Sequence, residues 1–309
     1  MTNRLSTSGK GRYAFVLFDS TFKVVICTRE NKRLLKEIIE LLTGKHISNI
    51  TLKDKEQHGL VIEEKNVTFD ILCEDEETGE EFLVEVQNAD KDSFRDRMLA
   101  YSTYPVRQQL AEKIQKMRAG EDIDRMDYSL RPVYVISMVN FALKHDNDNA
   151  LEQDFISKYE LRNGRNNELL TQSLNFVFLE MGRLKLGPDD KDKCKNLLER
   201  FIFSMKYMHL LTERPKGFDD PLLKDLYDAT ELASMTIDKR EKYDKIMTNE
   251  LDRICEISFA RKEGEAEGRA EGRAEGRAEV ARNLLKMGMP VEDIAKATSL
   301  SEEQIAALK

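Results

Sequence analysis

The sequence predicts an α/β fold with a helical C-terminal extension. Up to Phe141, segments with helical and strand-like patterns follow one another in the order helix, three strands, helix, strand. Over Asp190–Phe259 the pattern is mostly helical, with breaks at Pro215–Gly217 and at Pro221. With 309 residues, the chain has the length of one large domain or two modest ones.

The first predicted helix covers Glu30–Thr43. Its leucines and isoleucines recur with helical spacing, Asn31 is a suitable N-cap residue, and Gly44 is a suitable stop. At the start of the chain, Met1–Arg12 are polar and lack the apolar stretch of a secretory signal. We expect these twelve residues to form a disordered tail.

Three strand-like runs follow the helix: a short one at Gly59–Glu63, then Val67–Cys73 and Glu81–Gln87. The last two flank an acidic loop that contains the turn signal Thr78-Gly79. Two runs rich in strand-forming residues around a short, glycine-containing loop predict a β-hairpin.

The next predicted elements are a helix and three more strands. Ser93–Met117 indicates a long helix with a basic side, in which Pro105 could introduce a break. Pro132–Phe141 is so apolar that we expect a strand at the centre of the sheet. Asp154–Leu161 and Leu174–Glu180 indicate further strands.

Residues 263–279 repeat a four-residue unit of the type EGRA. In a helix this period stacks like charges at i,i+4, which is mildly unfavourable. Each of the glycines in the repeat costs about 0.8–1 kcal/mol relative to alanine in a helix. An isolated helix should therefore be weak, and we expect either a flexible tether or a helix that another copy of the chain supports.

The last segment, 280–309, predicts two short helices, the first over Val291–Ala297 and the second after the capping-box sequence Ser301–Gln304. Two helices with a three-residue turn resemble a helix-turn-helix. However, Glu302 and Glu303 lie at the end that a DNA-reading helix points toward the groove, where acidic residues oppose phosphate. We therefore expect a structural or oligomer-contact role more than DNA reading.

Composition limits the possible classes of protein. A net charge of −8 disfavours a general nucleic-acid coat protein, but it is compatible with a nuclease whose carboxylates bind metal ions. No run of apolar residues is long enough for a membrane span, so we expect none. The four cysteines are far apart and form no C-x-x-C pair, which fits a reducing cytoplasm.

The residues with the most chemical content are Asp70, Glu85 and Gln87. Strand alternation puts Asp70 opposite its apolar neighbours, and it puts Glu85 and Gln87 on one shared face. If the hairpin loop is centred between Glu77 and Thr78, Asp70 stands directly opposite Glu85. Two facing carboxylates repel each other, and a divalent cation would relieve that repulsion. Mg²⁺ suits such an oxygen-rich, partly open site.

A metal ion between these carboxylates would support phosphodiester hydrolysis. It would polarise the phosphate, activate a bound water for in-line attack and stabilise the leaving 3′ oxygen. Gln87 would orient the nucleophile or donate a hydrogen bond to the phosphate. Glu37 or Glu40 on the first helix could complete the metal shell, and Arg95 or Arg97 on the following helix could bind a phosphate.

The element order, with Asp on the second strand and Glu-x-Gln on the third, resembles the αβββαβ core of PD-(D/E)XK nucleases. That core is a restriction-endonuclease-like mixed sheet flanked by helices. More narrowly, the chain resembles the recombination-promoting nuclease and transposase group of this superfamily over residues 13–280. The segments that carry the resemblance are Asp19-x-x-Phe22-Lys23, Asn31–Leu42, Phe69-Asp70-Ile71, Phe82–Gln87, Phe94-x-x-Arg97, Tyr101, Gln109-Leu110, Pro132-Val133-Tyr134 and the trailing EGxA repeat.

The resemblance implies a Mg²⁺-dependent DNA endonuclease associated with recombination or mobile elements, with Mn²⁺ as a possible substitute for Mg²⁺. Asp70, Glu85 and Gln87 would be catalytic, with Asp70 and Glu85 as metal ligands. Glu40 stands where the group usually has asparagine, and it would add a ligand if it faces the site. Gln87 replaces the superfamily lysine, and this removes a cation that could stabilise charge in the transition state. Phe69 stands where the superfamily has proline.

These observations divide the chain into a tail (1–12), a nuclease core (13–150), a mixed and then helical extension (151–260), the repeat (261–279) and the helical module (280–309). DNA is the expected partner, and a homo-oligomer could form through the repeat and the module. Two alternatives stay open. One is a catalytically inactive nuclease fold that binds DNA, and the other is a scaffold whose C-terminal part binds other proteins.

Overall fold

The computed structural model describes residues 11–53, 71–89, 93–119, 128–145 and 154–308. The chain forms two compact units, Met1–Ile246 and Met247–Lys309, and one helix, α6 (Ile237–Lys286), runs from the first into the second. None of the helices in the described ranges has the length and apolar content that crossing a bilayer requires.

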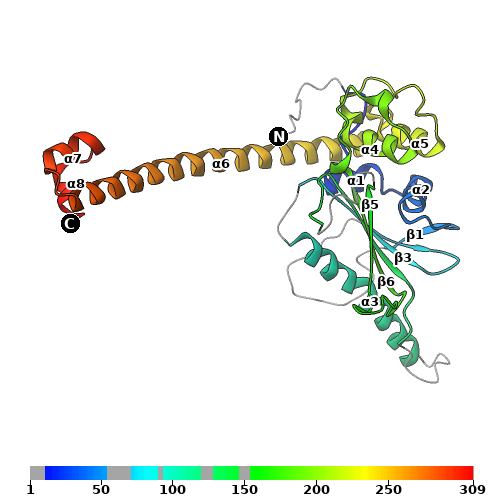
Figure 1. Ribbon diagram of the computed structural model, residues 1–309. Coiled ribbons are helices and arrows are strands. Elements are labelled where there is room, and N and C mark those ends of the chain that lie inside the picture. The colour runs from blue at the N-terminus through cyan, green and yellow to red at the C-terminus, as the bar shows by residue number, and fades with distance from the viewer. Residues whose placement is uncertain (1–10, 54–70, 90–92, 120–127, 146–153, 309) are drawn as a thin grey trace. The chain divides into compact units, whose positions relative to one another are not determined.

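The first unit is built on a six-stranded sheet with the strand order β1-β2-β3-β4-β6-β5 (Figure 1). β1, β2 and β3 pair antiparallel, β3, β4 and β6 pair parallel, and β5 is an antiparallel edge strand beside β6. The predicted α/β fold with a mixed sheet is therefore confirmed. In chain order the strands are β1 (Ile50–Leu52), β2 (Ile71–Asp75), β3 (Glu81–Gln87), β4 (Val133–Val139), β5 (Ile156–Glu160) and β6 (Leu174–Glu180).

Helices cover both faces of this sheet (Figure 1). Because strand side chains alternate between faces, Leu83 points to one face of β3 and Phe82 to the other. Leu83 packs with Phe94 and Met98 of α3, so α3 covers the Leu83 face. Phe82 stacks on Tyr134, whose hydroxyl accepts a hydrogen bond from Lys45, the second residue after α2. The helices that end or begin in this unit are α1 (Asp19–Val25), α2 (Lys32–Thr43), α3 (Phe94–Arg118), α4 (Leu197–Tyr207), α5 (Pro221–Thr230) and α6.

α2 confirms the first predicted helix. It starts after Asn31, as expected, but the Asn31 amide donates to the Val25 carbonyl at 2.8 Å and makes no capping bond. Gly44 ends the helix at φ 74°, a left-handed conformation that glycine adopts without the steric cost of a Cβ.

α3 is continuous through Pro105, so the break that Pro105 could have introduced is absent. Proline inside a helix removes one hydrogen bond and costs about 3 kcal/mol or more. The cost is offset here because α3 is fixed by tertiary contacts on both sides of Pro105, which is itself buried. Phe94 and Met98 pack on the sheet, and the Gln109 amide exchanges hydrogen bonds with the backbone of Arg131.

β4 lies between β3 and β6 and confirms the predicted central strand. β1, at Ile50–Leu52, was not predicted, because three residues are too few to show an alternating pattern. The strand predicted at Gly59–Glu63 lies outside the described residues.

The chain after β6 is helical, as predicted. Pro221 begins α5 as its first residue, because its fixed φ and missing N–H suit a helix start, and Asp220 caps the helix. Arg12, the last residue of the expected tail, already packs on this part. Its N–H donates to the Leu211 carbonyl at 3.1 Å, and its guanidinium pairs with Glu231 at 2.7 Å.

The hairpin of β2 and β3 is fixed by the Asp75 carboxylate. One Asp75 oxygen accepts hydrogen bonds from the hydroxyl and N–H of Ser48, and the other accepts from the hydroxyl and N–H of Thr78. Burial raises the pKa of Asp75. The hydrogen bonds from Ser48, Thr78 and the Asn49 N–H lower it by more than burial raises it, so the pKa lies well below its usual value. The ionised carboxylate therefore ties the hairpin turn to the segment before β1.

The pKa of Asp75 is lower in the folded protein than in the unfolded chain, where it is about 3.9. The ionised carboxylate therefore stabilises the fold at pH values above about 3.9. This stability is lost as the pH falls through the folded-state pKa. We expect Asp75→Asn to lower the free energy of unfolding by about 2 kcal/mol at pH 7. The difference from the wild type should shrink as the pH falls below about 4. Urea unfolding of both proteins between pH 7 and pH 3 measures this, and a difference independent of pH would contradict it.

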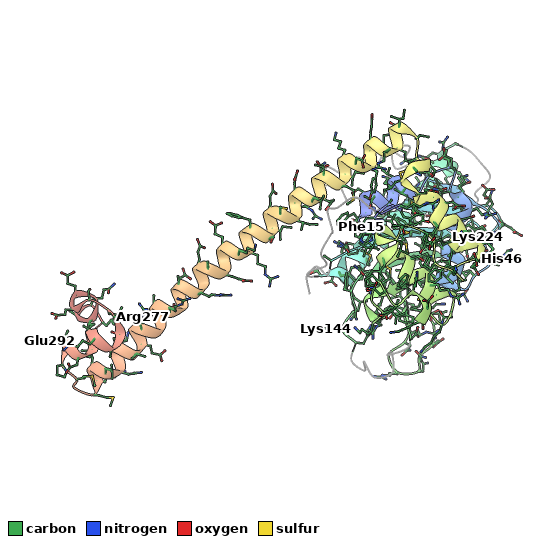
Figure 2. The ribbon with its side chains drawn as sticks, turned by 90° about the horizontal axis from the view of Figure 1, so that it is seen from above. Phe15, His46, Lys144, Lys224, Arg277 and Glu292 are labelled. Atoms are coloured by element: carbon green, nitrogen blue, oxygen red, sulfur yellow. The ribbon has the colours of Figure 1, made fainter. Side chains whose placement is uncertain are left out.

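In the second unit, α6 carries the EGRA repeat as a continuous helix, exposed along nearly its whole length. Arg277, labelled in Figure 2, lies in this exposed stretch. The sequence left open a tether or a helix, and the structure shows a helix. Support by another copy remains a prediction.

The end of α6 packs with α7 (Val291–Thr298) and α8 (Glu302–Ala306) around the buried residues Ala281, Ile294 and Ile305. Ser301 and Gln304 form the predicted capping box: each side chain accepts from the other's backbone N–H. The three-helix module therefore has a small apolar core of its own.

Candidate active site

The carboxyl ends of β3, β4 and β6 meet at one edge of the sheet, because these strands are parallel. In the register of the sheet, Gln87 pairs with Val139, and Val139 pairs with Glu180. One step back along the strands, Glu85 pairs with Ser137. Glu85, Gln87 and Glu180 share the face of Leu83, which α3 covers. Polar side chains thus gather at this edge.

The hairpin has the register that the sequence predicted. Ile71 pairs with Val84, and the ladder continues to Glu74 and Glu81, which centres the loop between residues 77 and 78. Asp70 lies outside the described residues, directly before β2 in the chain. The register of its neighbours is the one that a pairing of Asp70 with Glu85 needs, and the pairing itself remains a prediction.

Glu85 is a buried carboxylate, with 3% of its surface exposed. An Arg97 terminal nitrogen, Nη2, lies 3.8 Å from Glu85 Oε1, within the range of an ion pair but beyond a hydrogen bond. The hydroxyl of Ser137, on the neighbouring strand, donates to the Met98 sulfur at 2.9 Å. A carboxylate oxygen such as this is the kind of ligand that a hard divalent cation takes in proteins.

Gln87 is also buried, and both ends of its amide are engaged. Its Oε1 accepts a hydrogen bond from Arg97 Nη2 at 2.6 Å, and its Nε2 donates to the Ala89 carbonyl at 3.0 Å. The structure therefore brings Glu85, Gln87 and Arg97 together, three of the residues that the sequence singled out.

Arg95, the second predicted phosphate ligand, is exposed and reaches along the same edge of the sheet. Its guanidinium donates to the Lys144 carbonyl at 2.6 Å and lies 5.9 Å from the centre of the Tyr159 ring. Figure 2 shows Lys144 at the surface of this unit. Arg95 therefore links α3 to the segment that follows β4, and its role as a phosphate ligand remains a prediction.

Glu40 is not brought to Glu85. Its carboxylate accepts a hydrogen bond from the Ile47 N–H at 2.8 Å and lies 3.3 Å from His46. The reason is the layer in which it lies. Lys45, two residues after the end of α2, contacts Tyr134 on the Phe82 face of the sheet, whereas Glu85 points to the α3 face. Glu37, on the same helix, pairs with Arg33 at 3.5 Å. Neither acidic residue of α2 contacts the hairpin site.

Within the described ranges, no three acidic, histidine or cysteine side chains gather as a metal-binding group. Of the three predicted metal ligands, Glu85 lies at the strand edge, Glu40 lies elsewhere and Asp70 is not described. The Glu85 carboxylate has the oxygen chemistry that Mg²⁺ prefers, but one carboxylate makes only part of a metal shell.

Comparison with known protein families adds to this geometry. The family described as PD-(D/E)XK nuclease family transposase matches residues 16–260. The chain belongs to this family. The resemblance to PD-(D/E)XK nucleases that the sequence suggested is therefore confirmed.

A second family, described as Rpn/YhgA-like nuclease family, C-terminal HTH domain, matches residues 274–309. These residues include the three helices around Ile294, so the helix-turn-helix resemblance of the module is also confirmed. The comparisons with curated proteins and with solved structures found no match.

Another polar cluster lies at the same end of the parallel strands, around Glu180. Its buried carboxylate accepts hydrogen bonds from Ser157, the Leu143 N–H and Arg183, and it lies 2.8 Å from His145 Nε2. Burial raises the pKa of Glu180, but the bonds from these four groups lower it below its usual value. Sequence reasoning missed the cluster, and its only signal was an acidic residue at the end of an apolar strand.

Proposed function

We propose that the chain is a metal-dependent DNA endonuclease that hydrolyses phosphodiester bonds and acts in recombination or on mobile elements. One observation carries the proposal: a buried Glu-x-Gln pair at the carboxyl edge of β3, in a hairpin whose register would bring Asp70 opposite Glu85. Membership of the nuclease-family transposases supports it.

Asp70 and Glu85 would hold Mg²⁺, for which Mn²⁺ could substitute. A bound ion of this kind supplies Lewis acidity toward a phosphate and lowers the pKa of a bound water. The residues of the chain would do the rest. Glu85 is positioned on a central strand, so its oxygen is fixed before substrate binds. Arg95, exposed beside the site, would bind a neighbouring phosphate of the DNA strand.

The C-terminal module would add DNA contacts or join two copies of the chain. Its match to a helix-turn-helix domain supports DNA binding. The acidic pair at the start of α8, Glu302 and Glu303, is exposed and disfavours insertion of that end into a groove. A contact role for the module and a cytoplasmic location of the protein remain predictions.

The test is cleavage of supercoiled plasmid by the purified full-length chain. We expect nicking in Mg²⁺ or Mn²⁺, none in EDTA, and none by Asp70→Ala in any metal. Equal nicking by the wild type and Asp70→Ala would indicate a contaminating nuclease. A wild type that binds DNA but never nicks it would instead establish an inactive nuclease fold, which the neutral Gln87 would then explain.

A further inference from the structure

The Glu-x-Gln strand lacks a cation of its own. Gln87 stands where a lysine would supply positive charge beside the scissile phosphate, and an amide carries none. Gln87 is also fixed: it is 4% exposed, its Oε1 accepts from Arg97, and its Nε2 donates to the Ala89 carbonyl. Turning the amide toward a substrate would break both hydrogen bonds. The Gln87 side chain therefore positions Arg97 and does not contact the substrate itself.

Arg97 brings a cation to the same place from another element. It lies in the first turn of α3, where its N–H donates to the Ser93 carbonyl at 2.9 Å. Its Nη2 is 2.6 Å from Gln87 Oε1 and 3.8 Å from Glu85 Oε1. The rings of Phe94 and Tyr101 lie 6.0 and 5.9 Å from the centre of the guanidinium. The group is thereby oriented by four side chains.

The guanidinium also has hydrogen-bonding capacity left. Its Nε is buried and has no acceptor among the described residues. Nε and Nη2 form one edge of the planar group, the edge with which arginine binds an anion through two parallel hydrogen bonds. A quarter of the Arg97 side chain remains exposed. Buried donors without an acceptor are rare in native proteins, and a bound ligand is one explanation.

We propose that Arg97 is the catalytic cation of this nuclease and takes the role that Gln87 cannot fill. The inference rests on the proposed function. Its guanidinium donates to a non-bridging oxygen of the scissile phosphate. As the oxygen of water bonds to phosphorus, the bond from phosphorus to the 3′ oxygen breaks. The electron pair stays on that oxygen, which takes up a proton, while the attacking water releases one to solvent. Arg97 stays protonated throughout and stabilises the negative charge that builds up on the phosphate.

The experiment is a two-by-two comparison of full-length variants in plasmid cleavage with Mg²⁺: wild type, Arg97→Ala, Gln87→Lys, and both changes together. We expect Arg97→Ala to lower the cleavage rate by about 10²–10³-fold. Gln87→Lys should cut within about tenfold of the wild type, and the double variant within about tenfold of Gln87→Lys, because a lysine at position 87 restores the missing charge. Arg107→Ala, an exposed arginine on the same helix, is the matched control and should cut like the wild type.

A second readout separates catalysis from folding and binding. The affinity of Arg97→Ala for a labelled DNA duplex in EDTA, measured by fluorescence anisotropy, should stay within about threefold of the wild type, because the interaction is strongest in the transition state. Arg97→Lys keeps the positive charge but not the planar edge, so its cleavage rate should lie between those of the wild type and Arg97→Ala. This variant still tests the inference if Arg97→Ala folds poorly.

Two outcomes would overturn the inference. One is wild-type cleavage by Arg97→Ala. The other is an equal fold loss in cleavage rate when Arg97→Ala is added to Gln87→Lys and when it is made in the wild type. That result would make Arg97 a structural support. A wild type that does not cut would contradict the proposed function, and this inference with it. A wild type that cuts, together with either of the two outcomes above, would contradict this inference alone.

Discussion

Glu85→Gln should abolish DNA cleavage while leaving the protein folded. Glutamine has nearly the shape of glutamate, but its amide cannot serve as an anionic ligand for a divalent cation. Losing a ligand of this kind removes several kcal/mol of transition-state stabilisation, which corresponds to a rate lower by about 10³-fold or more. Plasmid cleavage in Mg²⁺ measures the rate, and calorimetric titration with Mn²⁺ measures metal binding, which should weaken with it.

Stability distinguishes this effect from misfolding. Glu85 is a buried carboxylate 3.8 Å from Arg97, and glutamine keeps its volume and one of its acceptor oxygens. We expect Glu85→Gln to be folded at the temperature of the cleavage assay, which a thermal unfolding curve of the variant measures. Glu160→Gln, on the edge strand β5, is an exposed control and should change neither activity nor metal affinity. Full cleavage by Glu85→Gln would remove Glu85 from the metal site.

Glu180→Leu should be the most destabilising single change at the carboxyl edge of the sheet. The carboxylate is fully buried and holds Arg183 and His145, whose side chains are only 10% and 11% exposed. Removing the anion leaves the Arg183 charge buried without its partner and the Ser157 hydroxyl without its acceptor. Breaking a buried ion pair from one side costs about 3–5 kcal/mol. Urea unfolding at pH 7 measures the loss in the free energy of unfolding.

Two further variants sharpen the Glu180 prediction. Glu180→Gln keeps the volume and one acceptor oxygen, so it should lose less stability than Glu180→Leu. Glu160→Leu removes an exposed carboxylate that pairs with Arg162 on the surface, and it should cost less than about 1 kcal/mol. A Glu180→Leu protein as stable as Glu160→Leu would mean that the cluster contributes nothing to the fold.

The elements of the fold were largely predictable because their patterns are local. The period of α2, the turn residues between β2 and β3, the apolar run of β4 and the capping box at Ser301 each lie within a few neighbouring residues. Two of the elements that differed from the prediction were decided by packing. Pro105 stays inside α3 because tertiary contacts hold the helix on both sides of it, and β1 is a strand because it pairs with β2.

The sequence by itself determined the hairpin, its register and therefore the face that Glu85 and Gln87 share, since alternation along a strand is a property of the backbone. Only the tertiary structure decided which distant residues reach that face. α3 brings Arg97 to Gln87, and α2 keeps Glu40 on the other side of the sheet. Glu180 collects partners from three places in the chain: the segment 143–145, Ser157 and Arg183. Such contacts depend on how helices pack on a sheet, and no spacing within one segment encodes them.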